Sequence, residues 1–295
     1  MRTLKYEIGS KYDGCSVKTV LTKELMLSSS LIAKLKQIEN GICLDGEGIR
    51  TNAQVRCGQI LSVVIGASPS CQGELPYPIL FEDEDILIID KPSGAAAHGS
   101  RYDDEVESIE SRVTAYYGNK LMYHPVSRLD RGTTGIMTIA KNGYMHQRLS
   151  DKLHTDGFLR EYLAVVHGKL KEKAGTIDLP IGRADGSAIK REVRADGARA
   201  LTGFEVVGEA GELSLVRCVP ETGRTHQIRL HMAAIGHPLC GDWLYGKEEP
   251  ELIDRPALHS EKLSFVHPLT NERITLSCEL PEHMLRLITH SNPQP

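Results

Sequence analysis

A segment rich in glycine, proline and serine divides the chain into two parts. It extends from Gly66 to Pro78, and residues of these types interrupt helices and strands. The parts on either side have lengths that are common for single domains. We therefore predict a small domain over residues 1–66, a linker over 67–78 and a larger domain over 79–295.

The first part has the pattern of a helix followed by short strands. The three serines over 28–30 can cap a helix that Gly41 ends. The apolar residues inside it follow helical spacing and are Leu31, Ile32, Leu35 and Ile38. Short strands are predicted over 42–44, 48–50 and 59–65, with a turn at Asp45-Gly46. This pattern is typical of a small α+β domain.

The second part mixes strands with helices. One helix is predicted over 143–156, on the spacing of Met145, Leu149 and Leu153, and another over 223–235, on that of Ile228, Met232 and Ile235. Strands are predicted over 135–141, 161–167, 200–207, 212–219, 258–266 and 272–279. The last four form two hairpins, so we predict an α+β fold with a mixed, mainly antiparallel sheet.

Composition and charge limit the classes of protein to which this chain can belong. No apolar run approaches the roughly 18 residues of a membrane helix, and the seven cysteines include no Cys-x-x-Cys pair. We therefore expect a cytoplasmic protein with reduced thiols, without a structural metal. The net charge of −4 argues mildly against a protein that binds nucleic acid. However, residues 120–160 hold seven Lys or Arg against three Asp or Glu, and residues 183–199 hold five against three.

Two motifs that would suggest other enzyme classes are incomplete. Residues 241–248 imitate a phosphate loop but end in Glu248, where Ser or Thr would bind magnesium. His226 and His231 are five residues apart, whereas two metal ligands on one helical face would be four apart. We find no Gly-x-Ser-x-Gly elbow of a serine hydrolase.

The segment 127–135 is the strongest candidate for chemistry. It reads Ser-Arg-Leu-Asp-Arg-Gly-Thr-Thr-Gly and leads directly into a predicted strand. Its single carboxylate, Asp130, lies between Arg128 and Arg131, and nearby positive charge favours the ionised form of an acid. A loop on a rigid strand can present such a side chain to a substrate.

Four blocks in the same order resemble the RluA-type pseudouridine synthases. The first is the strand and Lys-Pro-Ser-Gly of 86–94, and the second is the Arg-Leu-Asp segment around Asp130. The third is the Arg-Glu-Tyr strand of 160–168, and the fourth is Thr-Gly-Arg-Thr-His-Gln-Ile-Arg at 222–229. The resemblance extends from about residue 80 to the C-terminus.

This resemblance implies an RNA uridine isomerase that needs no cofactor and no metal. It implies that Asp130 is the catalytic residue, that Arg229 pairs with it and that Tyr162 lies against the target base. Whether the carboxylate acts as a nucleophile or as a base stays open. Arg128 would hold the flipped nucleotide or the gap that it leaves, and Arg224 would contact phosphate or order its loop. The target uridine must leave its stack, which favours unpaired RNA.

The partner is expected to be RNA, and three alternatives stay open. The first part of the chain resembles the S-four-type RNA-binding domain, which favours large-subunit ribosomal RNA. Transfer RNA is the second candidate substrate, and a non-catalytic RNA-binding or ribosome-assembly factor of the same fold is the third reading. Lys190 and Arg191 lie in the basic segment 183–199, which is either an RNA-facing loop or a solvated charged turn.

Overall fold

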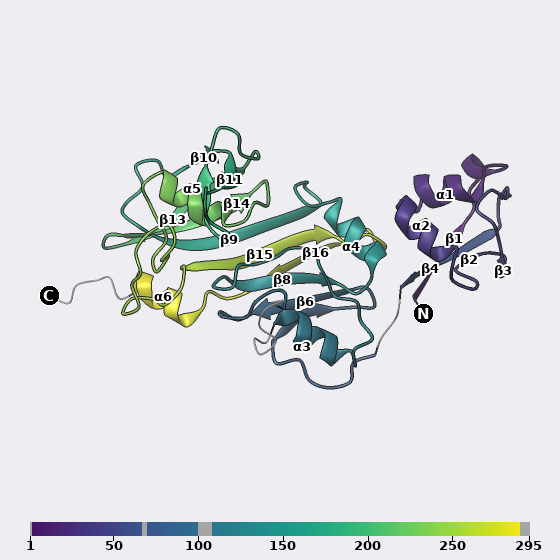
Figure 1. Ribbon diagram of the computed structural model, residues 1–295, viewed down its shortest axis with the longest axis horizontal. Coiled ribbons are helices and arrows are strands. Elements are labelled where there is room, and N and C mark those ends of the chain that lie inside the picture. The colour runs from purple at the N-terminus through teal and green to yellow at the C-terminus, as the bar shows by residue number, and fades with distance from the viewer. Residues whose placement is uncertain (1, 67–69, 100–107, 290–295) are drawn as a thin grey trace.

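The computed structural model describes residues 2–66, 70–99 and 108–289 (Figure 1). The first part of the chain forms a four-stranded sheet with the order β1-β4-β2-β3. Its strands are β1 (Arg2–Glu7), β2 (Ile42–Leu44), β3 (Glu47–Gly48) and β4 (Ile60–Gly66). The helices α1 (Val17–Lys23) and α2 (Ser29–Leu35) pack against this sheet, and a 3-10 turn covers Ser10–Tyr12.

The second part is built on a ten-stranded sheet, whose main path has the order β10-β13-β14-β9-β15-β8-β6-β5. β16 pairs with β15 and β7 pairs with β8, while β11 and β12 form a separate hairpin. Its strands are β5 (Ile79–Glu82), β6 (Ile86–Lys91), β7 (His124–Pro125), β8 (Thr134–Ala140), β9 (Phe158–His167), β10 (Ala174–Asp178), β11 (Ile181–Arg183), β12 (Arg191–Val193), β13 (Leu201–Ala210), β14 (Leu213–Pro220), β15 (Leu258–Val266) and β16 (Arg273–Ser277).

The helices of the second part are α3 (Ile109–Tyr116), α4 (Gly143–Ser150), α5 (Gln227–Ala234) and α6 (Glu282–Thr289). Among the named strands of the described residues, β15 and β8 are the one parallel pair. The predicted α+β fold with a mixed, mainly antiparallel sheet is confirmed.

Three predicted helices are shorter than the sequence pattern indicated. α2 begins after Ser28, whose hydroxyl accepts a hydrogen bond from the Leu31 N–H, but it ends at Leu35, so that Ile38 lies outside it and is exposed. α4 ends at Ser150 instead of continuing to residue 156. α5 ends at Ala234, because Gly236 adopts a φ of 88° that a continuing helix cannot contain. The prediction that Ile235 belongs to the core stripe is therefore wrong.

The two parts share packing and polar contacts. Tyr144 of α4 is buried in the hydrophobic cluster of the first part. Arg2 of β1 donates to Asp85, with 2.9 Å between Arg2 Nη2 and Asp85 Oδ2. Asp85 is 2 % exposed and also accepts from Asn142 Nδ2 at 2.9 Å. Of these two donors, Arg2 is the one that joins the parts, and losing its bond would leave a buried carboxylate short of a donor, which is costly.

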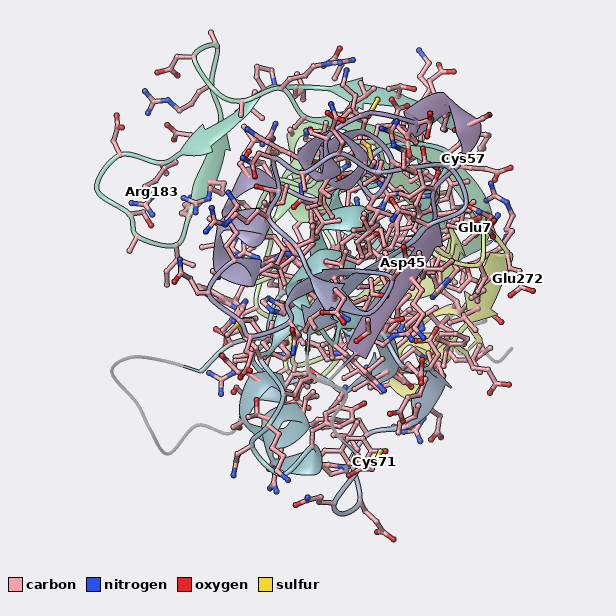
Figure 2. The ribbon with its side chains drawn as sticks, turned by 90° about the vertical axis from the view of Figure 1, so that its right-hand side faces the viewer. Glu7, Asp45, Cys57, Cys71, Arg183 and Glu272 are labelled. Carbon is pink, nitrogen blue, oxygen red and sulfur yellow. The ribbon has the colours of Figure 1, made fainter. Side chains whose placement is uncertain are left out.

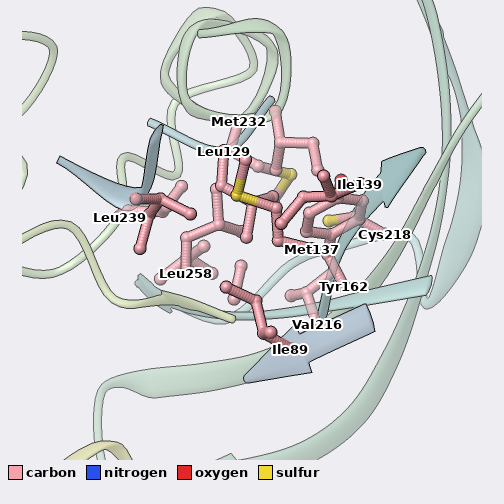
Figure 3. Packing of buried hydrophobic residues seen from close by; sticks show 14 of the residues in the cluster. Ile89, Leu129, Met137, Ile139, Tyr162, Val216, Cys218, Met232, Leu239 and Leu258 are labelled. Atoms are coloured by element: carbon pink, nitrogen blue, oxygen red, sulfur yellow. The ribbon is translucent and has the colours of Figure 1, made fainter. Parts of the chain in front are cut away.

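The hydrophobic core anchors the segments that carry the candidate site. Leu129, Tyr162, Met232 and Leu258 belong to one buried cluster (Figure 3). Ile228 belongs to the same cluster. Leu129 immediately precedes Asp130, and Ile228 immediately precedes Arg229. The polar side chains of the site are therefore attached to backbone whose neighbouring residues are packed.

Gly135, at the start of β8, can be replaced only at a large cost. Its φ is 102°, and an added Cβ would lie 2.9 Å from the carbonyl carbon of Ser260 and closer still to its oxygen. We expect Gly135→Ala to lower the free energy of unfolding by more than the about 1–2 kcal/mol of backbone strain alone. Gly186→Ala is the matched control, because Gly186 has a φ of 70° and open space around it. Urea unfolding of both variants measures this, and equal losses would contradict the packing argument.

Candidate active site

Asp130 lies in the loop between β7 and β8, which backbone bonds hold in place. The Thr133 N–H donates to the Asp130 carbonyl at 3.0 Å and closes a turn. Gly94 and Arg131 exchange two bonds, since the Gly94 N–H donates to the Arg131 carbonyl and Arg131 Nε donates to the Gly94 carbonyl. Arg131 therefore fastens the loop to the segment after β6. The Asp130 side chain is 27 % exposed, so a substrate can reach it.

Two buried cations hold the carbonyls that follow Asp130. Lys91 Nζ donates to the carbonyls of Pro92 and Arg131, at 2.9 and 3.2 Å. Arg255 Nη1 donates to the Gly132 carbonyl at 2.9 Å. Burial, with help from the positive charge of Arg255, lowers the pKa of Lys91 to about 8, and Asp130 opposes this shift. Burial lowers the pKa of Arg255 to about 10, although Asp254 raises it.

The buried ammonium of Lys91 makes stability depend on pH. Its pKa is about 8 in the folded protein against 10.5 for a free lysine, so the unfolded chain binds more protons between these two values. Stability from this residue is therefore fully present above pH 10.5 and is lost as the pH falls to 8. We expect the difference in unfolding free energy between wild type and Lys91→Met to rise by up to about 1.4 kcal/mol per pH unit in this window. Urea unfolding across the window measures it, and a constant difference would contradict the argument.

Arg229 connects Asp130 to a second, fully buried carboxylate. Its Nη1 lies 3.5 Å from Asp130 Oδ2. Its Nε and Nη2 donate to the two oxygens of Asp242, each at 2.7 Å, and Asp242 is 0 % exposed. Burial alone would lower the pKa of Arg229, but the bond to Asp242 and the charge of Asp130 raise it. Arg229 is therefore a fixed positive charge beside Asp130.

His226 approaches Asp130 from α5 and is hydrogen-bonded to Tyr245 on its other side. His226 stands at the N-terminus of α5 in the left-handed conformation, with a φ of 57°. Its Nε2 lies 4.0 Å from Asp130 Oδ2, and its Nδ1 lies 2.9 Å from the Tyr245 hydroxyl. That hydroxyl also accepts the Arg191 N–H at 2.9 Å. Burial lowers the pKa of His226, while Asp130 raises it.

A pocket of about 120 Å³ collects most of the predicted site residues. Asp130 and Tyr162, both candidate catalytic residues, line it, and Tyr162 is 6 % exposed on β9. The other predicted residues in its lining are Arg128, Arg224 and Arg229. Its lining holds four arginines, the fourth being Arg160, against the single carboxylate of Asp130. The pocket is smaller than the roughly 300 Å³ at which drug-sized sites begin, and its excess of positive charge suits an anionic substrate.

Lys190 and Arg191 lie outside this lining, on the β11–β12 hairpin. Figure 2 shows this hairpin, with Arg183, standing out from the rest of the molecule. Lys190 is exposed, and Arg191 is close enough for its charge to lower the pKa of His226. Arg194 of the same hairpin is paired with Asp185, Glu192 and Asp196, so it is not available to a partner.

Several residues of the site were not predicted from the sequence. Asp242, Tyr245, Lys91 and Arg255 carry no local pattern that reveals their contacts, because each meets the site from a distant segment. Lys91 and Asp242 fall in segments that resemble the family, which was the one available signal. Among the residues that the structure describes, no helix has the length and apolar character needed to span a membrane.

Comparisons with known proteins show the family of the chain. The family model of RNA pseudouridylate synthase matches residues 85–234. A Bacillus subtilis protein described as the uncharacterized RNA pseudouridine synthase YjbO is 40 % identical over 91 % of this chain and 97 % of its own length. The ribosomal large subunit pseudouridine synthase D of Nitrosomonas europaea is 33 % identical over 84 % of this chain and 76 % of its own.

A solved structure supports the fold alone. The human RNA pseudouridylate synthase domain containing 1 protein has a TM-score of 0.59 at 23 % identity, over 75 % of this chain and 89 % of its own. The family match covers half of the sequence and includes Asp130, Tyr162 and Arg229. The chain therefore belongs to the RNA pseudouridylate synthase family and is an RNA pseudouridine synthase of the RluA type.

Proposed function

We propose that Asp130 is the essential carboxylate of the isomerisation. The reaction breaks the bond between ribose C1′ and uracil N1, turns the base and joins C1′ to C5; C5 loses its hydrogen as a proton and N1 gains a proton, so that the product is an isomer of uridine. The step needs a carboxylate that attacks or stabilises C1′ or that removes a proton from the sugar. The observation that carries the proposal is the position of Asp130, a half-buried acid in a pocket with Arg229 3.5 Å away.

Arg229 and Tyr162 have supporting roles in this proposal. Arg229 holds a positive charge 3.5 Å from the Asp130 carboxylate and would help to fix its position in the pocket. Tyr162 presents an aromatic ring from β9 against which the uracil can lie. The pocket has room for part of one nucleotide, so the uridine must leave its stack to enter.

The remaining predicted residues would bind RNA around the pocket. Arg128 and Arg224 are exposed at its lining and would contact the nucleotide and its flanks. Lys190 and Arg191 would contact RNA from the hairpin. In the small domain over residues 1–66, Lys36 and Arg50 line a separate groove, which supports an S-four-type RNA-binding role.

The substrate that we propose is large-subunit ribosomal RNA. The relatives include a ribosomal large subunit pseudouridine synthase that is 33 % identical, and the small domain would add contacts to a large RNA. We expect the protein to reside in the cytoplasm.

Purified protein and unmodified transcripts test the choice of RNA. Transcripts of large-subunit ribosomal RNA and of transfer RNAs are incubated separately, and pseudouridine is mapped chemically in each. We expect modification at specific uridines of the ribosomal transcript. Modification of transfer RNA alone would assign the enzyme to that substrate, and binding without modification of either would favour the non-catalytic assembly factor.

A further inference from the structure

Arg160 carries a buried N–H group that the protein does not satisfy. It lies two residues before Tyr162 on β9, hence on the same face of the strand, and it lines the pocket. Its Nε is buried and has no hydrogen-bond partner among the described residues. A buried donor left unpaired costs about 1–3 kcal/mol, so an acceptor from outside the protein would stabilise this arrangement.

A nearby arginine on the other face of the sheet shows the contrast. The Nε of Arg217 on β14 is likewise buried without a hydrogen-bond partner, but this arginine lies close to two carboxylates, with its Nε 3.3 Å from Glu161 and its Nη1 3.4 Å from Glu205. Its charge is therefore neutralised within the protein. No ion pair of this kind is formed by Arg160 in the part of the chain that the structure describes.

Arg224 approaches the same place from the loop before α5. It is exposed, lines the same pocket and donates through Nε to the Arg199 carbonyl at 3.0 Å. This bond orients the guanidinium, whose two terminal nitrogens have no acceptor among the described residues. Two arginines thus offer donors at one side of the pocket, and Asp130, the only acid in its lining, already faces Arg229.

His154 lies beside this edge of the pocket, against Gly223. A Cβ added to Gly223 would lie 3.3 Å from His154 Cε1, so the imidazole packs against the residue that precedes Arg224. Burial lowers the pKa of His154, and the positive charges of Arg160 and Arg224 lower it further, against a bond to the Glu221 carbonyl. The three side chains are therefore within electrostatic reach of one another.

We propose that Arg160, Arg224 and His154 bind one phosphate of the RNA backbone next to the target uridine. This inference rests on the proposed function, because a uridine in the pocket places its own phosphodiesters at the pocket edge. Guanidinium groups match phosphate oxygens with paired hydrogen bonds. A bound phosphate would satisfy the buried Nε of Arg160 and offset the positive charge of the two arginines.

Salt dependence of binding provides the test. The dissociation constant of an unmodified large-subunit ribosomal RNA transcript is measured at several salt concentrations. Each phosphate contact on single-stranded RNA contributes about 0.7 to the slope of log affinity against log salt. We expect Arg160→Gln to reduce the slope by about this amount, Arg160→Lys to keep it, and the matched control Arg217→Gln to leave it unchanged. If Arg160→Gln does not fold, Arg224→Gln replaces it with the same expectation.

Uridine conversion on the same samples separates this inference from the proposed function. Wild type that converts uridine, together with an Arg160→Gln slope equal to that of wild type, overturns the phosphate site alone. Wild type that converts no uridine overturns the proposed function, while a reduced slope still supports the phosphate site.

A synthetic stem–loop locates the contact. Two versions of it are made, in which a neutral methylphosphonate replaces the phosphate either on the 5′ side or on the 3′ side of the mapped uridine. We expect one of the two versions to bind wild type more weakly than the unmodified stem–loop does, but to bind Arg160→Gln as well as the unmodified one. Equal losses of affinity for both proteins would contradict a direct contact.

Discussion

Asp130→Asn is expected to lower the rate of pseudouridine formation by about 10²–10⁴-fold, the range that a positioned acid–base group contributes. Asparagine has the same shape but can neither attack C1′ nor accept a proton. Its amide still fits the loop, because the loop is held through the carbonyls of Asp130, Arg131 and Gly132. The rate is measured as release of tritium from uridine labelled at C5, under single-turnover conditions.

A matched substitution distinguishes chemistry from general damage. Asp151→Asn alters an exposed acid at the end of α4 and should leave the rate unchanged. The affinity of Asp130→Asn for RNA should stay within a few-fold of wild type, because the arginines of the pocket remain. An Asp130→Asn protein with more than a tenth of the wild-type rate would contradict the proposed role of this carboxylate.

Arg229→Met is expected to lower the free energy of unfolding by about 3–5 kcal/mol, the usual cost of removing one partner from a buried ion pair. The substitution leaves Asp242 as an uncompensated charge, and Asp242 is 0 % exposed. It also removes the positive charge beside Asp130, so activity should fall even where the protein is folded. Urea unfolding followed by circular dichroism measures the first effect.

The control for Arg229 is an ion pair on the surface. Arg286 and Glu282 pair across one turn of α6, with both side chains largely exposed. Arg286→Met should change stability by less than about 1 kcal/mol, because exposed pairs contribute little. Similar losses in the two variants would contradict the account of Arg229 and Asp242 as a buried pair.

Local patterns predicted much of the sheet. The alternation that places Tyr162, Ala164 and Val166 on one face is confirmed by their common cluster. The two hairpins β13–β14 and β15–β16 also follow the predicted ranges closely. These elements could be predicted because period-two alternation and turn residues are signals that lie within a few neighbouring positions of the sequence.

Helix boundaries were harder to predict than strand positions, and some helices were not predicted at all. α1, α3 and α6 were not predicted, although Ser108 and Ser111 form a capping box at the start of α3. α5 has six consecutive buried residues from Gln227 to Met232, polar ones included. Its burial comes from the site packed around it, which an amphipathic pattern cannot express.

The site could be predicted only in its linear motifs. The family blocks named Asp130, Tyr162 and Arg229, and the structure brings these three to one pocket. The contacts of Asp242, Lys91 and Arg255 join segments far apart in sequence, and no spacing rule gives such distances. The left-handed conformation of His226, which turns its ring toward Asp130, was equally hidden.

The central claim is that this pocket converts uridine in cellular RNA through Asp130. The most direct test is pseudouridine mapping of ribosomal and transfer RNA from a deletion strain, complemented with wild type or with Asp130→Asn. We expect specific pseudouridine sites in large-subunit ribosomal RNA to disappear in the deletion strain and to return only with wild type. Sites that return equally with Asp130→Asn would contradict the role of this carboxylate.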